Sequence, residues 1–138
     1  MKKSWFLFLC SFLILLTSGC SQKQSTISIN TLLTHLSEQD LHIVKDDDVT
    51  ATIFTRKLHH EKPFTYLIND QPAFIYVFSS TKNRVKGIKQ FKHDTESVNL
   101  VMYSYFEHKN ILIFYVPTTT DEHYENTNSL ISEALLQL

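Results

Sequence analysis

Apolar and polar residues recur with different periods along the chain, and these periods predict a succession of helices and strands. Over residues 27–41, apolar residues recur at helical spacing and give one apolar face. A short strand is predicted over 41–45 and a further extended segment over 49–58, where β-branched and aromatic residues are frequent. Between them, Asp46-Asp47-Asp48 is expected to form a solvated turn, although its carboxylates are also the ligand type of a hard cation.

Two β-hairpins are predicted next, each with two strands around a polar turn. In the first, residues 64–68 alternate in polarity and residues 73–78 are continuously apolar, with the turn sequence Asn-Asp-Gln-Pro between them. The second hairpin has the same layout over 100–106 and 111–116. A continuous apolar run of this length suits a buried central strand, and strands joined by a short turn must pair antiparallel.

A helix is predicted after each hairpin, so two strand-strand-helix units stand in tandem. The first helix spans 82–93, follows a serine or threonine cap within 79–81, and carries Val85, Ile88 and Phe91 on its inner side. The second follows a capping box formed by Thr119 and Glu122. The expected inner face of this last helix consists of Tyr124, Ile131, Ala134, Leu135 and Leu138.

These elements predict an α+β fold. The expected architecture is a two-layer sandwich, in which an antiparallel sheet of about four to six strands has its helices on one face. The N-terminal helix over 27–41 is expected either to join that helical layer or to pack at its edge. At 138 residues, the chain is long enough for one such domain, predicted over residues 27–138.

The first twenty residues are patterned differently from the predicted domain. Lys2 and Lys3 precede an apolar run from Trp5 to Leu16. As a helix, this run of about twelve residues would reach only about 18 Å, whereas crossing a bilayer takes roughly 20 apolar residues. The pattern therefore predicts a cleaved signal peptide over residues 1–19 better than a permanent membrane span.

The residues before Cys20 resemble the lipobox of bacterial lipoproteins, with Ser18 and Gly19 directly before the cysteine. Thr17 stands where a lipobox usually has leucine, and Leu16 lies one place further out. The resemblance implies cleavage before Cys20 and attachment of diacylglycerol and N-acyl chains, such as palmitate, at that cysteine. The alternative is an ordinary secretory leader that ends in a cysteine.

Such a lipoprotein is expected to be anchored on the extracytoplasmic face of the cell membrane. Two or three acyl chains are sufficient for stable anchoring, because each buried methylene contributes about 0.8 kcal/mol. Residues 20–26 are then the lipidated cysteine and a polar tether. The six residues after Cys20 would reach about 20 Å.

Composition excludes several classes of function. Because Lys2 and Lys3 belong to the leader, 11 of the 13 basic residues remain against 14 acidic ones, and this weak imbalance gives no general attraction to nucleic acid. The two cysteines, Cys10 and Cys20, both lie at the N-terminus, so a disulfide or a cysteine-based metal site inside the domain is excluded. Beyond the leader, Gly87 is the sole glycine, which excludes glycine-rich phosphate loops. No cofactor is expected.

A second resemblance covers roughly residues 58–117, and most of the matching positions are hydrophobic. They are Pro63, Tyr66, Ile75 to Phe78, Ser80, Arg84, Gly87 and Leu112 to Val116. The pattern is similar to small uncharacterised lipoproteins of Bacillus-type Firmicutes. This implies a Gram-positive source, with the anchor in the outer leaflet of the cytoplasmic membrane, and it implies no activity.

Two surfaces are candidates for binding. The helix over 82–93 carries five cations and no acid before Asp94, so it is a candidate for contact with anionic lipid or an anionic cell-wall polymer; the alternative is a solvated helix face. These cations are Lys82, Arg84, Lys86, Lys89 and Lys92. An open face of the sheet is the second candidate, for a protein or glycan, if it exposes Tyr66, Tyr103 or Tyr105.

The seven histidines form no metal-binding motif. The tightest group is His59-His60-Glu61, but adjacent side chains on a strand point to opposite faces, so a metal would need distant partners such as His42. These histidines are expected at the surface of a loop before Pro63, and no metal site is assigned.

No nucleophile elbow, zincin or kinase motif is present. The leading hypothesis is therefore a non-catalytic, membrane-anchored interaction module of the cell envelope. The alternatives are a lipoprotein that binds a small solute or a metal, and a hydrolase acting on envelope material.

Overall fold

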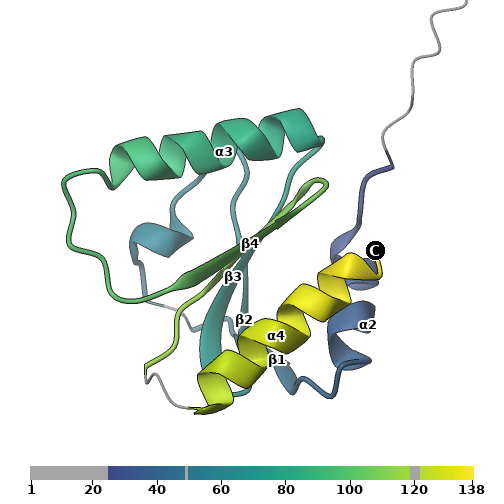
Figure 1. Ribbon diagram of the computed structural model, residues 1–138. Coiled ribbons are helices and arrows are strands. Elements are labelled where there is room, and N and C mark those ends of the chain that lie inside the picture. Colours follow the sequence, from purple (N-terminus) through teal and green to yellow (C-terminus); the bar gives the residue numbers. More distant parts are fainter. Residues whose placement is uncertain (1–24, 49, 119–121) are drawn as a thin grey trace, which may run out of the picture.

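The computed structural model describes residues 25–48, 50–118 and 122–138, and in these ranges it has one five-stranded sheet with helices on both sides (Figure 1). A short 3-10 helix, Ile53–Thr55, lies beside the sheet. The described elements are α2 (Ile29–Ser37), β1 (Ile43–Lys45), β2 (Phe64–Ile68), β3 (Gln71–Val77), α3 (Thr81–Asp94), β4 (Ser104–His108), β5 (Ile111–Tyr115) and α4 (Glu122–Leu136).

The strand order is β1-β2-β3-β5-β4, and all neighbouring strands are antiparallel. The centre of the sheet is formed by β3 and β5, whose register runs from Ala73 opposite Tyr115 to Val77 opposite Ile111. The predicted α+β class is confirmed, as are the tandem units, which are β2-β3-α3 and β4-β5-α4.

The prediction that the helices cover one face is wrong, because they cover both. In Figure 1, α3 lies on one side of the sheet and α4 with α2 on the other. Ala73 and Ile75 of β3 belong to the core under α2 and α4, whereas Phe74 and Tyr76 belong to the core under α3. A strand that is apolar at every position must be covered on both faces, and β5 has the same pattern. We call the two sides the α4 face and the α3 face.

The α4 face is built as the helical spacing predicted. Leu32 and Leu36 of α2 are fully buried, and so are Ile131 and Ala134 of α4. Tyr124 and Leu138 pack at the edge of the same core. The N-terminal helix thus joins α4 in one layer, which is one of the two arrangements expected from the sequence.

The α3 face is built around aromatic rings, with Phe54 at their centre. Its ring centroid lies 5.7 Å from Phe74, 5.7 Å from Phe91, 5.2 Å from Tyr103 and 5.5 Å from Phe114. Such ring pairs contribute about 0.5–1.5 kcal/mol each beyond the area they bury. The rings on this face therefore hold the 3-10 helix to the sheet.

The extended segment predicted over 49–58 is wrong for its central part, which is this 3-10 helix. Thr52 caps it: the Phe54 amide donates to the Thr52 hydroxyl oxygen at 3.2 Å, and the Thr52 amide donates to the Thr55 hydroxyl oxygen at 2.9 Å. The buried Tyr76 hydroxyl shares its single proton between the carbonyl oxygens of Phe54 and Arg56. Local capping and this long-range contact override the strand propensity of the threonines.

Gly87 lies on the inner side of α3, where it allows close approach of the Phe78 ring. A β-carbon at this position would lie 2.5 Å from Cζ of Phe78, which is fully buried. Val85, expected on the inner side, is instead half exposed. The helix is therefore rotated so that its glycine, with Ile88 and Phe91, faces the sheet.

We expect Gly87→Ala to lower the free energy of unfolding by about 1 kcal/mol. Overpacking against Phe78 costs about 1–3 kcal/mol, and the better helix propensity of alanine offsets about 1 kcal/mol of it. Urea unfolding measures the change, with Val85→Ala, an exposed site on the same helix, as the control. A Gly87→Ala variant more stable than the parent would contradict this packing.

The β4–β5 turn joins three parts of the chain at one end of the sheet. The buried Asn110 amide donates to the carbonyl oxygens of Ile27 (3.0 Å) and Phe78 (2.9 Å), and its oxygen accepts from the Ile27 amide at 2.7 Å. Lys109 donates to the carbonyl oxygen of Leu138. We call this the tether end, because Ile27 directly follows the predicted tether; the opposite end, at the β2–β3 turn, is the pocket end.

Candidate functional site

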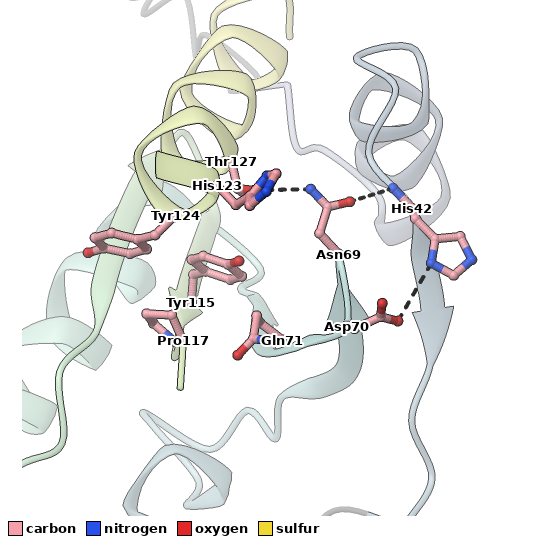
Figure 2. A pocket seen from close by; sticks show the side chains of 9 residues that line it. All are labelled: His42, Asn69, Asp70, Gln71, Tyr115, Pro117, His123, Tyr124 and Thr127. Atoms are coloured by element: carbon pink, nitrogen blue, oxygen red, sulfur yellow. Dashed lines mark hydrogen bonds and ion pairs between the residues drawn. The ribbon is translucent and has the colours of Figure 1, made fainter. Parts of the chain in front are cut away.

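A polar cavity of about 380 Å³ opens at the pocket end, on the α4 face (Figure 2). Its walls come from the residue before β1, the β2–β3 turn, the end of β5 and the first turns of α4. The lining residues are His42, Asn69, Asp70, Gln71, Tyr115, Pro117, His123, Tyr124 and Thr127.

Asn69 holds the two sides of this cavity together. Its amide nitrogen donates to the buried Thr127 hydroxyl of α4 at 3.0 Å, and its side-chain oxygen accepts from the His42 backbone amide at 3.0 Å, as Figure 2 shows. The Asn69 backbone amide donates to the His42 carbonyl oxygen at 2.8 Å. The predicted turn therefore forms one wall of the cavity, and the Asn69 side chain joins it by hydrogen bonds to His42 on one side and Thr127 on the other.

The backbone at this turn explains the choice of residues. Asn69 and Asp70 have φ of 48° and 60°, in the left-handed region. Two successive left-handed residues form the tight hairpin turn whose twist matches that of the strands, and asparagine and aspartate tolerate this conformation better than most residues. Gln71 and Pro72, expected within the turn, already belong to β3.

The opposite wall is aromatic and is fixed by hydrogen bonds. The Tyr115 and Tyr124 rings are stacked, with centroids 6.2 Å apart and planes 11° apart. The Tyr124 hydroxyl lies 2.6 Å from the Ser104 hydroxyl. The Gln71 side-chain oxygen accepts from the Thr118 amide at 2.8 Å and from its hydroxyl at 2.9 Å. The cavity therefore offers a flat ring surface beside oriented polar groups.

The ionisable groups of the cavity lie at its mouth. His42 Nδ1 and Asp70 Oδ1 are 3.9 Å apart, and the two side chains are 68% and 83% exposed. His123 is also exposed. The side chains of His42 and Asp70 are therefore accessible to a ligand that enters the cavity. Within residues 25–48, 50–118 and 122–138, no three histidine, cysteine or carboxylate side chains are placed to share a metal ion.

The five cations of α3 do not form one surface. Arg84 turns inward: its side chain is only 11% exposed, it pairs with Glu107, and its Nε donates to the Lys109 carbonyl oxygen at 2.7 Å. Burial lowers the pKa of this guanidinium, which remains charged. The remaining cations, Lys82, Lys86, Lys89 and Lys92, are exposed, and their contact with an anionic surface stays a prediction.

The three tyrosines predicted as a binding face are divided between the two sides of the sheet. Tyr66 packs on the α4 face, whereas Tyr103 and Tyr105 lie together on the α3 face, with ring centroids 6.4 Å apart. Tyr103 is part of the aromatic core, and Tyr105 is 41% exposed under Lys92, whose Nζ lies 5.1 Å from the ring centroid. The three tyrosines therefore share no face, because Tyr66 lies on the opposite side of the sheet from Tyr103 and Tyr105.

His59 and His60 form a tight turn beside α3. Their φ values are 43° and 75°, and the turn is closed by paired backbone hydrogen bonds between Leu58 and Glu61. The His59 backbone amide donates to the Gln90 side-chain oxygen at 2.8 Å. The turn therefore fixes the chain to α3, and the surface loop expected here is more ordered than its sequence indicated.

His108, at the tether end, has a pKa lowered by its surroundings. Its Nε2 is buried without a hydrogen-bond partner among the described residues. Burial, together with the positive charges of Lys109 and Arg84, lowers the pKa of this imidazole below 6.5. The folded protein consequently favours the neutral histidine.

We expect this shift to make the protein less stable in mild acid. The unfolded chain takes up a proton at about pH 6.5 and the folded chain at a lower pH, so the contribution of His108 is complete above about pH 6.5 and is lost as the pH falls below it. Urea unfolding at pH 7 and pH 5 should show a smaller loss for His108→Gln than for the parent. His93→Gln, at an exposed site, is the control, and equal losses in all three proteins would contradict the assignment.

Cys20, the predicted signal peptide over 1–19 and Thr119 of the predicted capping box lie outside the described residues. Among the helices that are described, none has the length and apolar character needed to span a membrane. A comparison with protein-family models found no matching family, and searches of curated proteins and of solved structures found no significant match.

Proposed function

We propose that this chain is a non-catalytic interaction module, anchored through lipid on Cys20 to the extracytoplasmic face of the cell membrane. The observation that carries the proposal is the separation of the two ends of the sheet. Asn110 binds Ile27 at the tether end, whereas the polar cavity around Asn69 opens at the pocket end.

This separation suits a protein that presents a binding site away from a membrane. The seven residues of β3 span about 20 Å between the two ends. With a tether of about 20 Å, the cavity stays within about 40 Å of the bilayer. A partner in the envelope could then contact the pocket end without displacing the anchor.

Photo-cross-linking in intact cells tests the binding end. The full chain carries a photoreactive residue at Asp70, in the mouth of the cavity, or at the exposed Gln137 near the tether end. We expect a discrete envelope adduct from position 70 that position 137 does not give. The same adducts from both positions, or none from position 70, would count against a binding role for this end.

Metabolic labelling tests the anchor separately. Cys20→Ala is expected to abolish palmitate incorporation and to release the protein from the membrane fraction, because the acyl chains supply the membrane affinity. Palmitate labelling that persists in this variant would refute attachment at Cys20 and leave the cross-linking result unaffected.

A small-solute binding protein is the second candidate function, and the size and polarity of the cavity favour it. A cavity of about 380 Å³ lies within the usual range for small-molecule sites. A ligand that binds the folded state must raise the melting temperature. A thermal-shift screen of metal ions and of polar metabolites tests this, with Gln71→Ala expected to remove any shift that a true ligand gives. An unchanged melting temperature across the panel would exclude this function.

A further inference from the structure

A second cavity, of about 560 Å³, lies on the α3 face over the half of the sheet nearest the pocket end. Its floor is formed by Phe54, Phe74 and Val116. One side is formed by Asp46, Asp48, Thr50, Thr52 and Ile53, and the other by residues 98–101. Pro72 and Val116 line this cavity, while their neighbours Gln71 and Pro117 line the polar one, so the two cavities lie on opposite faces of the same end.

The cavity exists because the cover of this face is incomplete. Helix α3 ends at Asp94, and the chain returns through residues 98–101 before β4 begins at Ser104. Val98 and Val101 remain 50% and 64% exposed beside the cavity. Apolar side chains held in water gain about 25 cal/mol for each Å² that a ligand covers. The walls therefore favour a ligand with an apolar body.

The charge at the rim is one-sided. Asp46 and Asp48, which we call the acidic rim, line the cavity beside Thr50 and Thr52, and the described residues that line it include no lysine, arginine or histidine. Lys45 is not among the lining residues and pairs with Asp47, with Nζ 2.5 Å from Oδ1. The rim thus favours a positive charge next to the apolar floor.

The acidic rim is held in place by the sheet. The Asp46 backbone amide donates to the Thr65 carbonyl oxygen at 3.1 Å, and the Thr65 hydroxyl donates back to the Asp46 carbonyl oxygen. The Asp46 carboxylate accepts from the Asp48 amide at 3.1 Å. A carboxylate fixed in this way loses little conformational freedom when it binds a cation.

We infer that this cavity binds a small amphiphilic cation. Its apolar body lies on Phe74 and against Val101, and its ammonium group lies between the apolar floor and the carboxylates of Asp46 and Asp48. The cavity volume is that of a drug-sized ligand. This site is separate from the polar cavity and does not depend on the lipid anchor.

Two matched probes test the inference, 4-phenylbutylamine and 4-phenylbutyrate, which share an aromatic body and differ in charge. Calorimetric titration uses the full chain in nanodiscs of zwitterionic lipid, with empty nanodiscs as the blank. We expect the amine to bind at least about tenfold more tightly than the carboxylate, since that ratio corresponds to only about 1.4 kcal/mol.

Three variants locate the binding. Asp48→Asn should reduce the preference for the amine, and Val101→Ser should weaken both probes alike; both positions are exposed, so neither change removes a core contact. Gln71→Ala, in the polar cavity, should change neither affinity. Absence of amine binding, equal affinity for the two probes, or a preference that survives Asp48→Asn would each overturn the inference.

Discussion

Replacing Asn110 by alanine is expected to lower the free energy of unfolding by about 3–5 kcal/mol. Three hydrogen bonds disappear, and the amide of Ile27 and the carbonyl oxygens of Ile27 and Phe78 lose their partners in a buried position. Each buried group left unpaired costs about 1–3 kcal/mol. Urea unfolding of the full chain measures the loss.

A second readout separates loss of the Ile27 contact from general destabilisation. In native buffer, limited proteolysis of Asn110→Ala should cut near residue 27 before it cuts the sheet, because Ile27 and α2 are no longer held to the turn. Asn126→Ala, at an exposed position of α4, is the matched control and should stay within about 0.5 kcal/mol of the parent. A loss below 1 kcal/mol for Asn110→Ala would mean that water replaces the amide.

Phe54→Ala is expected to cost about 3–5 kcal/mol, as is typical of a buried phenylalanine. The side chain is 2% exposed and contacts four aromatic rings from β3, α3, β5 and the segment before β4. Its removal takes away the centre of the aromatic core and one of the residues that line the second cavity.

The control for this prediction lies in β2. Phe64 is 43% exposed, so Phe64→Ala removes a ring of the same size from a partly solvated site and should cost about 1 kcal/mol. Chemical unfolding of both variants gives the comparison. If the two losses were equal, the ring contacts of Phe54 would contribute nothing beyond what a surface ring contributes.

The first hairpin and the helices were predictable because their periodicity is local, whereas the first strand of the second hairpin was expected at 100–106 and lies at Ser104–His108. The first hairpin was expected at 64–68 and 73–78 and lies at Phe64–Ile68 and Gln71–Val77. The placement of helices on both faces of the sheet was not predicted, although the apolar runs in the sequence indicate it. Apolar residues at every position of β3 and β5 require cover on both faces, so a helix on each side follows from the same runs that indicated central strands.

The errors in local structure have long-range causes. The threonines before Phe54 favour a strand, but the Tyr76 hydroxyl binds the Phe54 carbonyl oxygen from 22 residues away and favours the 3-10 turn. Arg84 was grouped with the lysines of its helix, and its partner Glu107 comes from β4, an element whose position relative to α3 the sequence does not give. Helical periodicity alone could not separate it from Lys82 or Lys86.

Of the candidate site, only the β2–β3 turn was predicted from the sequence. Asn69 and Asp70 were recognised as turn residues, but the Asn69 amide binds His42 and Thr127, which are 27 and 58 residues away. The second cavity has no motif at all, since it results from the point where α3 ends and from the path of two irregular segments. Asp46 and Asp48 line the same cavity as Phe74, and the sequence does not indicate this because only the fold brings them together.

The fixing of Ile27 at one end of the sheet has a mechanical consequence. Traction between the anchored N-terminus and a partner held at the β2–β3 turn would enter the fold through Asn110 and leave it through Asn69, so the force would run lengthwise along β5 and β3. These strands face each other in five residue pairs, which would bear such a load together instead of opening one after another. For the membrane-anchored protein proposed above, this arrangement would resist a pull directed from the anchor to a partner at the β2–β3 turn.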